Sequence, residues 1–451
     1  SRGLSRQKLG LIEEALDDLN KAIELDERFV EAYVSRGALW NDRKRDPARA
    51  LRDFDKAIEL DPRNVGAHYN RGVALDSRGD FEGAIKAYTK AIDLDPKYVP
   101  AYVNRGAARN QKGQHDLAIE DLKQAIALNP KHKFAHNNYG NAEYSKGLYD
   151  NAIQRFTKAI ELDPEYQTAW MNRGNALLAK GEVHAALINL SKAIELDPKD
   201  SWAYFNRGRA WTAKGRFQEA IKDFSTAFQL DSTFTDALVH RGIAKQRAGL
   251  VDEAMSDYDK AIKAGTKDAG IHYNMGLLMA ENGLFEKAID AYSKAIDMNP
   301  KYAEAHANRG NGKVCMGLTQ EAIEDWRKAL NVAPPNWSYR SAVEDRIATQ
   351  GVGVVFQWAQ KLQKWKRHME AIEQYKVVAK SGARPKQALA SAYNISCSYA
   401  LLGDKPEALH WLEKAIEMGW NDLENLEKNA ELASLKEEPR YKKIVALLKS
   451  K

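Results

Sequence analysis

The chain has 451 residues, of which 44% are hydrophobic and 29% charged, and 68 Lys and Arg against 62 Asp and Glu give a formal net charge of +6. This small positive excess is spread along the sequence and gives no argument for a nucleic acid or an anionic membrane as the partner. No apolar stretch approaches 18 residues, which excludes a transmembrane helix. The two cysteines, Cys315 and Cys397, lie far apart, so we expect no disulfide framework.

A fixed motif recurs along most of the chain. An Asn-Arg-Gly triplet, as in AYVNRGAARNQKG from Ala101, places a glycine every 34 residues, with one interval of 35. The ten glycines of this series are Gly3, Gly37, Gly72, Gly106, Gly140, Gly174, Gly208, Gly242, Gly276 and Gly310. Two series of alanines keep the same interval, for example Ala84 and Ala91 in the third repeat. A repeat of this length predicts a solenoid of stacked repeats.

Each repeat contains two helical patterns. The first carries the triplet and stops at a second glycine, such as Gly79 or Gly113, which tolerates the left-handed conformation that closes a helix. The second has the form AIxxxxKAIELDP and stops before a proline, such as Pro96 or Pro130. We therefore expect a helix, a tight turn, an antiparallel helix and a short connection in every repeat.

The 34-residue interval breaks after Pro334. The next matching alanine, Ala371, follows Ala322 by 49 residues, and NWSYRSAVEDRIATQGVG fills the gap. We predict ten regular repeats over residues 1–333, a linker with an extra helix over 334–354, two divergent repeats over 355–419 and capping helices over 420–451. Because Ser1 already falls at the sixth position of a repeat, the first repeat is truncated and we expect the native protein to extend further.

These glycine, alanine, aromatic and proline positions resemble the tetratricopeptide repeat (TPR) family over roughly residues 1–334, and the segment that ends at Trp420 resembles the terminal repeat of TPR arrays. The resemblance implies an all-α fold, a right-handed superhelical solenoid of antiparallel helix pairs with about twelve repeats and C-terminal capping helices. It also implies that the first helices line a concave groove. In the family's numbering the triplet glycine is position 8 and the triplet asparagine is position 6.

The asparagines at position 6 are the main functional candidates. Interior helix positions do not favour asparagine, so a recurring one indicates another use, and its amide can both donate to and accept from the main chain of an extended peptide. This row resembles the asparagine ladder in the TPR superhelix of O-linked GlcNAc transferase. The predicted row is Asn70, Asn104, Asn138, Asn172, Asn206, Asn274 and Asn308. The alternative is that these asparagines only bridge or cap neighbouring first helices.

Variable positions on the first helices are expected to give the groove its specificity, since aromatic anchors beside amides suit an extended segment with apolar side chains. The predicted contacts are Asn137, Asn141, Tyr144, Met171, Asn175, Phe205, Arg209, Tyr273 and Asn311.

The arginine of the triplet is predicted to form an ion pair inside each repeat. In six of the eight repeats that have the arginine, an aspartate follows it by about sixteen residues on the second helix, and the two repeats without the arginine, at Tyr139 and Met275, also lack the aspartate. The predicted pairs are Arg36 with Asp53, Arg105 with Asp121, Arg207 with Asp223, Arg241 with Asp257 and Arg309 with Asp325. The alternative is a row of positive charge that binds an anionic ligand.

No pattern indicates catalysis, a metal site or a cofactor. The sequence contains no HExxH, CxxC or GxxxxGK motif, and His68, His136, His272 and His306 share a packing position with Tyr33 and Trp170.

We predict a non-enzymatic scaffold or adaptor that binds an extended or disordered segment of another protein, alone or within a multi-subunit complex, without nucleic acid and without membrane insertion. A targeting or regulatory subunit of an enzyme assembly is the alternative. An RNA-binding helical repeat would need basic groove positions, which these are not. We expect a soluble protein, with the cytoplasm favoured over an organelle or the periplasm.

Overall fold

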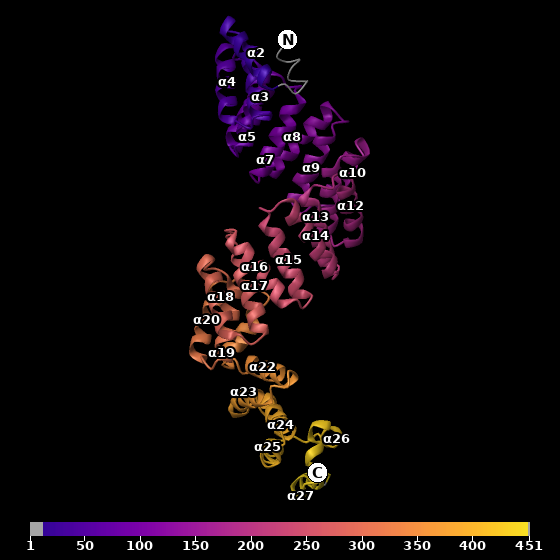
Figure 1. The fold of residues 1–451 in the computed structure, drawn as a ribbon, viewed down its shortest axis with the longest axis vertical. Helices are drawn as coiled ribbons and strands as arrows, with labels where there is room; N and C mark the ends of the chain where they lie inside the picture. Colours follow the sequence, from indigo (N-terminus) through magenta and orange to yellow (C-terminus); the bar gives the residue numbers. More distant parts are fainter. Residues whose placement is uncertain (1–11, 450–451) are drawn as a thin grey trace. The chain divides into compact units, whose positions relative to one another are not determined.

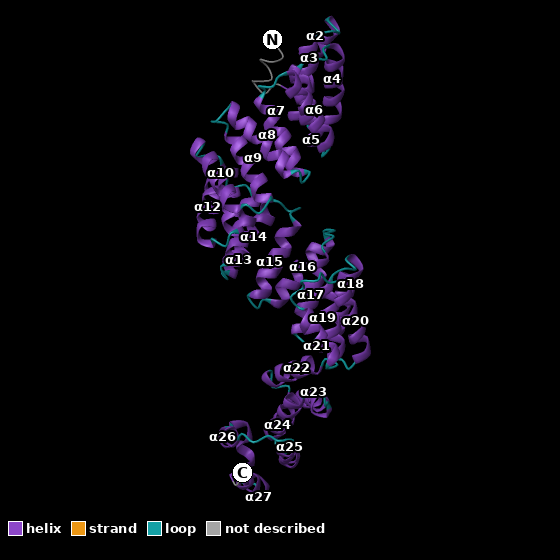
Figure 2. Cartoon of the chain, turned by 180° about the vertical axis from the view of Figure 1, so that it is seen from behind, coloured by secondary structure: helices purple, strands orange, loops and turns teal. Residues whose placement is uncertain are grey.

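The computed structural model describes residues 12–449, and every regular element within them is a helix (Figure 2). The chain divides into two compact units, Ser1–Ala244 and Lys245–Lys451, called here the N-terminal and C-terminal units. Within each unit, a helix packs against the next one and the pairs follow one another along the chain (Figure 1). The expected all-α solenoid of helix pairs is therefore confirmed.

The N-terminal unit alternates first and second helices of the repeats. The first helices are α3 (Val30–Asp42), α5 (Val65–Ser77), α7 (Val99–Gln111), α9 (Lys133–Ser145), α11 (Gln167–Ala179), α13 (Ser201–Ala213) and α15 (Thr235–Arg247), which crosses the unit boundary. The second helices are α2 (Ile12–Leu25), α4 (Pro47–Leu60), α6 (Phe81–Leu94), α8 (His115–Leu128), α10 (Tyr149–Leu162), α12 (Val183–Leu196) and α14 (Phe217–Leu230). Gly3 and the start of the first repeat lie outside the described residues.

The C-terminal unit begins with regular repeats and ends with less regular ones. Its regular helices are α16 (Val251–Lys263), α17 (Ala269–Glu281), α18 (Phe285–Met298), α19 (Ala303–Cys315) and α20 (Thr319–Val332). The later helices are α21 (Arg340–Ala348), α22 (Val352–Lys364), α23 (His368–Lys380), α24 (Pro385–Leu402), α25 (Lys405–Glu417), α26 (Leu423–Lys428), the 3₁₀ helix η1 (Ala430–Leu435) and α27 (Pro439–Lys449). The short α21 lies within the segment 334–354.

Turn residues account for the helix ends. Gly79 has φ +78°, the left-handed conformation that its place after α5 requires. The carboxylate of Asp80 then accepts a hydrogen bond from the amide of Gly83 at 2.9 Å and caps α6. The carboxylate of Asp95 accepts from the amide of Lys97 at 2.9 Å in the turn after α6.

Small residues set the close approach of the two helices in a repeat. A methyl group at Gly72 would lie 2.5 Å from the ring of Tyr88, so only glycine fits there. Ala84 and Ala91 are fully buried, and so is the Tyr88 ring that covers the glycine. A large side chain on the second helix therefore fills the space that the first helix leaves, and the same packing recurs between Gly276 and Tyr292.

No helix within residues 12–449 combines the length and the apolar character needed to cross a bilayer. Both cysteines are free thiols, with Cys397 buried and Cys315 partly buried.

Candidate functional site

The candidate site is the row of asparagines at position 6 of the first helices, called here the asparagine row. Its members in the N-terminal unit are Asn70, Asn104, Asn138, Asn172 and Asn206, and those in the C-terminal unit are Asn274 and Asn308. First helices of adjacent repeats contact one another, as α7 does α9 and α11 does α13. Successive members of the row therefore sit on neighbouring helices.

Hydrogen bonds between repeats orient several of these amides. The Nδ2 atom of Asn104 donates to the hydroxyl of Tyr69 at 3.0 Å, and that of Asn308 donates to the hydroxyl of Tyr273 at 2.9 Å. In the same way Asn172 Nδ2 donates to Oδ1 of Asn137 at 3.0 Å. The acceptor is always at position 5 of the preceding repeat, 35 residues earlier. The bridge between first helices, given above as the alternative use of these asparagines, is thus present at three joints.

The tyrosines that receive these bonds are protonated at neutral pH. Burial raises the pKa of Tyr69 above its ordinary value of 10.0, and the bond from Asn104 opposes that rise. Tyr273 has its pKa raised by burial in the same way. Each hydroxyl therefore keeps a proton that it can donate further while it accepts from the asparagine.

The members of the row differ in exposure. Asn70, Asn104, Asn138 and Asn172 are partly exposed. Asn206 is buried with 4% of its surface exposed, and its Oδ1 accepts from Arg209 at 3.3 Å. The prediction that Asn206 faces an open groove is corrected here: the side chains around it take up the space. Asn137, also predicted to line the groove, is likewise buried, at 3% exposed, and its Oδ1 accepts from Asn172 of the next repeat.

Phe205 belongs to the core and not to an open surface. It is 6% exposed, and its ring centroid lies 4.8 Å from those of Phe234 and His240. His240 is the position-6 residue of the following repeat, so an aromatic contact replaces the usual hydrogen bond at this joint. The predicted groove contact at Phe205 is therefore corrected to a packing role, while Trp202 beside it stays half exposed.

Most of the other predicted contacts of the N-terminal unit have solvent-exposed side-chain surface. Asn141, Tyr144 and Met171 are partly exposed and Arg209 is exposed. The Tyr144 ring lies 5.5 Å from that of Tyr149 on the second helix. Asn175 differs, because its Oδ1 is buried and meets no hydrogen-bond donor within residues 12–449.

In the C-terminal unit the amide of Asn308 makes more hydrogen bonds within the chain. Asn308 not only donates to Tyr273 but also accepts from Nδ2 of Asn311 at 3.0 Å. Asn311 in turn accepts from the indole nitrogen of Trp326 at 3.2 Å. These bonds form a chain from α17 through α19 to α20.

The chain's own segment 337–346 lies next to this part of the row. Tyr273 and Asn308 line a cavity of about 260 Å³ together with Trp337, Tyr339 and Arg346. The indole nitrogen of Trp337 donates to Glu304 at 2.8 Å and fixes the segment against α19. Burial lowers the pKa of Arg346, although Asp345 opposes the shift.

Helix α22 covers the ends of the first helices in the same unit. The Trp358 ring lies 4.8 Å from that of Phe285, and a methyl group at Gly283 would come within 2.5 Å of Trp358. The Lys361 ammonium donates to the main-chain carbonyl of Glu281 at the end of α17. The predicted contacts Asn274, Asn308 and Asn311 thus share a unit whose row is partly covered from within.

Four of the arginines at position 7 lie against aspartates of the second helix in their own repeat, whereas Arg173 donates to Asn189 there and Arg71 pairs with Asp55 of the preceding second helix. The nitrogen-to-oxygen distances are 2.7 Å for Arg36 and Asp53, 2.6 Å for Arg105 and Asp121, 2.8 Å for Arg207 and Asp223, and 2.6 Å for Arg309 and Asp325. Arg241 and Asp257 belong to different units, so their pair stays a prediction. In the C-terminal unit Asp257 is paired with Lys245 at 3.0 Å.

A second bond, made by six of the position-7 arginines and not predicted from the sequence, ties neighbouring repeats together. The Nη1 atom reaches back sixteen residues to a small polar side chain on the preceding second helix, a contact called here the arginine clasp. The clasps join Arg36 to Asn20, Arg105 to Thr89, Arg173 to Thr157, Arg207 to Ser191, Arg241 to Ser225 and Arg309 to Ser293. A hydroxyl or amide residue sixteen positions before each of these six arginines was the available signal.

Some of the aspartates hold a second cation. Asp325 is 1% exposed and lies 3.0 Å from Lys313 as well as against Arg309. Burial by itself would raise the pKa of Asp325, but the hydrogen bonds from Arg309 and Lys313 outweigh it and the pKa is lowered. Asp121 has the same arrangement with Arg109 at 2.8 Å. The Asp325 carboxylate is therefore charged, and in both repeats two cations lie against one buried aspartate.

The histidines at position 4 pack and do not converge on a metal. The Nε2 atoms of His68, His136 and His306 lie 3.0–3.1 Å from the carbonyl of the proline six residues earlier. Trp170 makes the same contact to Pro164 at 2.9 Å. Within residues 12–449 no three His, Cys, Asp or Glu side chains come together as a metal site would require.

Family models described as tetratricopeptide repeat or TPR repeat match most of this array. The matched residues are 1–29, 41–99, 99–132, 140–181, 174–211, 201–234, 280–311 and 388–419. Together they cover more than half of the chain.

Solved structures of repeat proteins are also similar. A tetratricopeptide repeat protein from Parabacteroides merdae is 22% identical with a TM-score of 0.46, covering 55% of this chain and 98% of its own. YrrB, described as a TPR protein with an unusual peptide-binding site, is 27% identical with a TM-score of 0.34, covering 41% and 95%. MamA is 30% identical with a TM-score of 0.32, covering 36% and 94%. No curated protein matches the chain.

Proposed function

Because the chain belongs to the tetratricopeptide repeat family, whose repeats mediate protein–protein interactions and are generally non-catalytic, we propose that it is an adaptor. Its asparagine row in the N-terminal unit binds an extended segment of another protein. The main-chain contacts are Asn70, Asn104, Asn138 and Asn172, which are the partly exposed members of the row. Asn141, Tyr144, Met171, Asn175 and Arg209 lie beside them and contact the side chains of the guest.

The spacing of packed helices supports a guest in extended conformation. Neighbouring helices lie about 8–10 Å apart, and an extended chain advances about 3.3 Å per residue. Amides on successive first helices therefore meet about every third residue of the guest. Main-chain recognition at this interval holds a segment without reading every side chain.

The observation that carries the proposal is the fixed orientation of the amides by the preceding repeat. Asn172 uses one N–H on Asn137 at 3.0 Å, and Asn104 uses one on Tyr69 at the same distance. An amide has a second N–H and a carbonyl oxygen beyond that bond. Because the first bond holds the side chain in one rotamer, less entropy is lost when the remaining groups bind a peptide.

Peptide selection followed by affinity measurement tests the proposal. Random 12-residue peptides are displayed on phage, selected on the full chain, and the enriched peptides are measured by fluorescence anisotropy. We expect Asn138→Ala with Asn172→Ala to weaken binding by about fivefold per asparagine, since a hydrogen bond contributes about 1 kcal/mol. The control is Asn308→Ala, whose amide already meets Asn311 and Tyr273.

Circular dichroism of the same variants separates the binding role from a purely structural one. The proposal is wrong if the double variant keeps full affinity for every selected peptide while its melting temperature falls. It is also wrong if Asn308→Ala weakens binding as much as the double variant does.

A further inference from the structure

A second surface of the N-terminal unit is formed by the starts of second helices and the ends of first helices. At three consecutive joints, the lysine that ends a first helix pairs with the acidic second residue of the preceding second helix. The pairs are Lys112 with Glu82, Lys146 with Asp116 at 2.5 Å, and Lys180 with Asp150 at 2.6 Å. These pairs hold the cation of each joint within the array.

The next joint breaks this pattern. Lys214 is the C-cap residue of α13, as Lys112, Lys146 and Lys180 are of α7, α9 and α11. The second residue of α12, however, is His184 instead of an acid. Within residues 12–449 no carboxylate lies within ion-pair distance of Lys214. Its ammonium lies 5.6 Å from the ring centroid of Trp211.

The same joint exposes apolar surface where other repeats are polar. Ile188 is 57% exposed. The residues at its position in the adjacent repeats are Gln154 and Lys222, and before them Lys86 and Glu120. An aliphatic side chain therefore replaces a charged or polar one at the joint that has also lost its acid.

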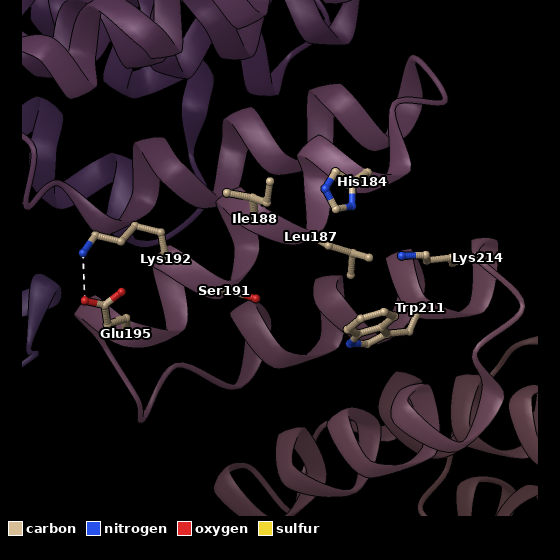
Figure 3. Close-up of a pocket in the computed structure, with 8 residues that line it drawn as sticks. All are labelled: His184, Leu187, Ile188, Ser191, Lys192, Glu195, Trp211 and Lys214. Atoms are coloured by element: carbon tan, nitrogen blue, oxygen red, sulfur yellow. Dashed lines mark hydrogen bonds and ion pairs between the residues drawn. The ribbon is translucent and has the colours of Figure 1, made fainter.

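These residues line one open pocket on the surface (Figure 3). Its volume is about 450 Å³, and Ile188, Leu187 and Trp211 are its apolar lining residues. Lys192 and Glu195 lie at one end, where they pair with each other at 2.8 Å, while His184 and Lys214 lie at the other end. The first end is neutral overall and the second end has an unmatched cation. Pockets that bind small groups span about 300–1,000 Å³, so this one has room for a large side chain of a partner.

We propose that this pocket is a docking site for a second protein segment that carries a large apolar side chain next to a carboxylate. The apolar side chain rests on Ile188 and Trp211, and the carboxylate pairs with Lys214. The partner thereby supplies the acid that Glu82, Asp116 and Asp150 supply within the array. This site lies on α12 and α13 and uses none of the asparagines of the proposed peptide row.

The substitution His184→Asp provides the sharpest test, because it restores the arrangement of the neighbouring joints and leaves the fold intact. Phage-displayed 12-residue peptides are selected on the full chain in the presence of a peptide that saturates the asparagine row. We expect the enriched peptides to pair Asp or Glu with Leu, Ile, Phe or Trp. His184→Asp should weaken binding of these peptides about fivefold, because the new carboxylate pairs with Lys214 within the chain and competes with the carboxylate of the peptide.

Two further variants define the chemistry. Ile188→Lys, which copies Lys222 of the following repeat, should weaken binding of the peptides about tenfold through lost apolar burial. Lys214→Glu should weaken the binding of acidic peptides. The same variant should bind the matching peptides in which lysine replaces the acid. Asn138→Ala with Asn172→Ala should leave all of these affinities unchanged, so the two sites are tested separately.

The proposal is overturned if the selected peptides show no acidic and apolar pairing, or if His184→Asp and Ile188→Lys bind them as the natural chain does. Sedimentation velocity provides a second check. A dimer that dissociates on Ile188→Lys would mean that the pocket joins two copies of this chain, and the proposal of a separate partner would be wrong.

Discussion

Asn104 in the N-terminal unit and Asn308 in the C-terminal unit make the same hydrogen bond, to Tyr69 and Tyr273, yet their surroundings differ. In both cases the accepting tyrosine belongs to the preceding repeat. Asn308 also borders a cavity lined by Trp337 and its neighbours, which belong to the segment inserted between the regular and the divergent repeats. The repeat motif thus fixes the bond, and the insertion determines how much of the row stays exposed.

The largest expected effect is on the ion pairs that both units share. Asp223 is 4% exposed and is paired with Arg207. Arg207→Leu should cost about 3–5 kcal/mol of unfolding free energy, because a buried charge loses its partner. Arg105→Leu should cost less, about 1–3 kcal/mol, because Arg109 still pairs with Asp121. Urea unfolding followed by circular dichroism measures both.

The equivalent change in the C-terminal unit tests whether the framework is the same there. Arg309→Leu leaves Lys313 on Asp325, so its cost should match that of Arg105→Leu. A cost as large as that of Arg207→Leu would contradict the role given to the second cation.

Trp358→Ala should act on the C-terminal unit alone. The ring is partly exposed and packs on Phe285 and Gly283. We expect a loss of about 2 kcal/mol, below the 3–5 kcal/mol of a fully buried aromatic residue. Hydrogen exchange should quicken at the ends of α17 and α19 and stay unchanged in α7 and α9. Unchanged exchange in α17 would mean that α22 does not cover the row.

Substitution of single asparagines should show a smaller difference between the parts of the asparagine row in the two units. Asn104→Ala breaks one bond, to Tyr69, and should cost about 1 kcal/mol. Asn308→Ala breaks the bond to Tyr273 and also leaves Asn311 without its acceptor, so it should cost more. Thermal melts of the two single variants compare them, and equal melting temperatures would contradict the chain of bonds in the C-terminal unit.

The smallest effect concerns pH and is expected in both units. Burial lowers the pKa of His136 and His306 below the ordinary 6.5. The unfolded chain therefore binds protons more readily than the folded chain does. The contribution of these histidines to stability is fully present above pH 6.5 and is lost as the pH falls toward their lower pKa in the folded state. Melting temperatures at pH 7.5 and 5.5 measure this loss. His136→Tyr with His306→Tyr, which copies the tyrosine of other repeats, should reduce it.

The sequence was sufficient to predict the helix pairs, because glycine and proline mark the ends of almost every regular helix. Gly79 and Gly113 have positive φ where the turn was expected. The burial of Ala84 and Ala91 was also predictable from their fixed interval. These features depend on local conformation and on contacts that recur identically in every repeat.

The site was less predictable, because it depends on pairs of residues from different repeats. Asn206 and Asn104 occupy the same position, but Asn206 is buried whereas Asn104 keeps part of its surface. Phe205 was expected to meet a ligand and instead packs on His240, a contact that appears only when adjacent repeats are compared. The position of α22 over α17 was also not predictable, since no repeat interval relates them.

The arginine clasps have a consequence for how the protein responds to force. Among the regular repeats within residues 12–333, two lack an arginine at position 7, because Tyr139 stands there in one and Met275 in the other, while Arg71 reaches back to Asp55 in place of a clasp. Pulled from its ends, each unit should part first at its unclasped joint and release its repeats in blocks instead of one at a time. Extension in optical tweezers would record these blocks as separate steps, and Arg173→Leu, which removes the clasp to Thr157, should lower the force needed to open its joint.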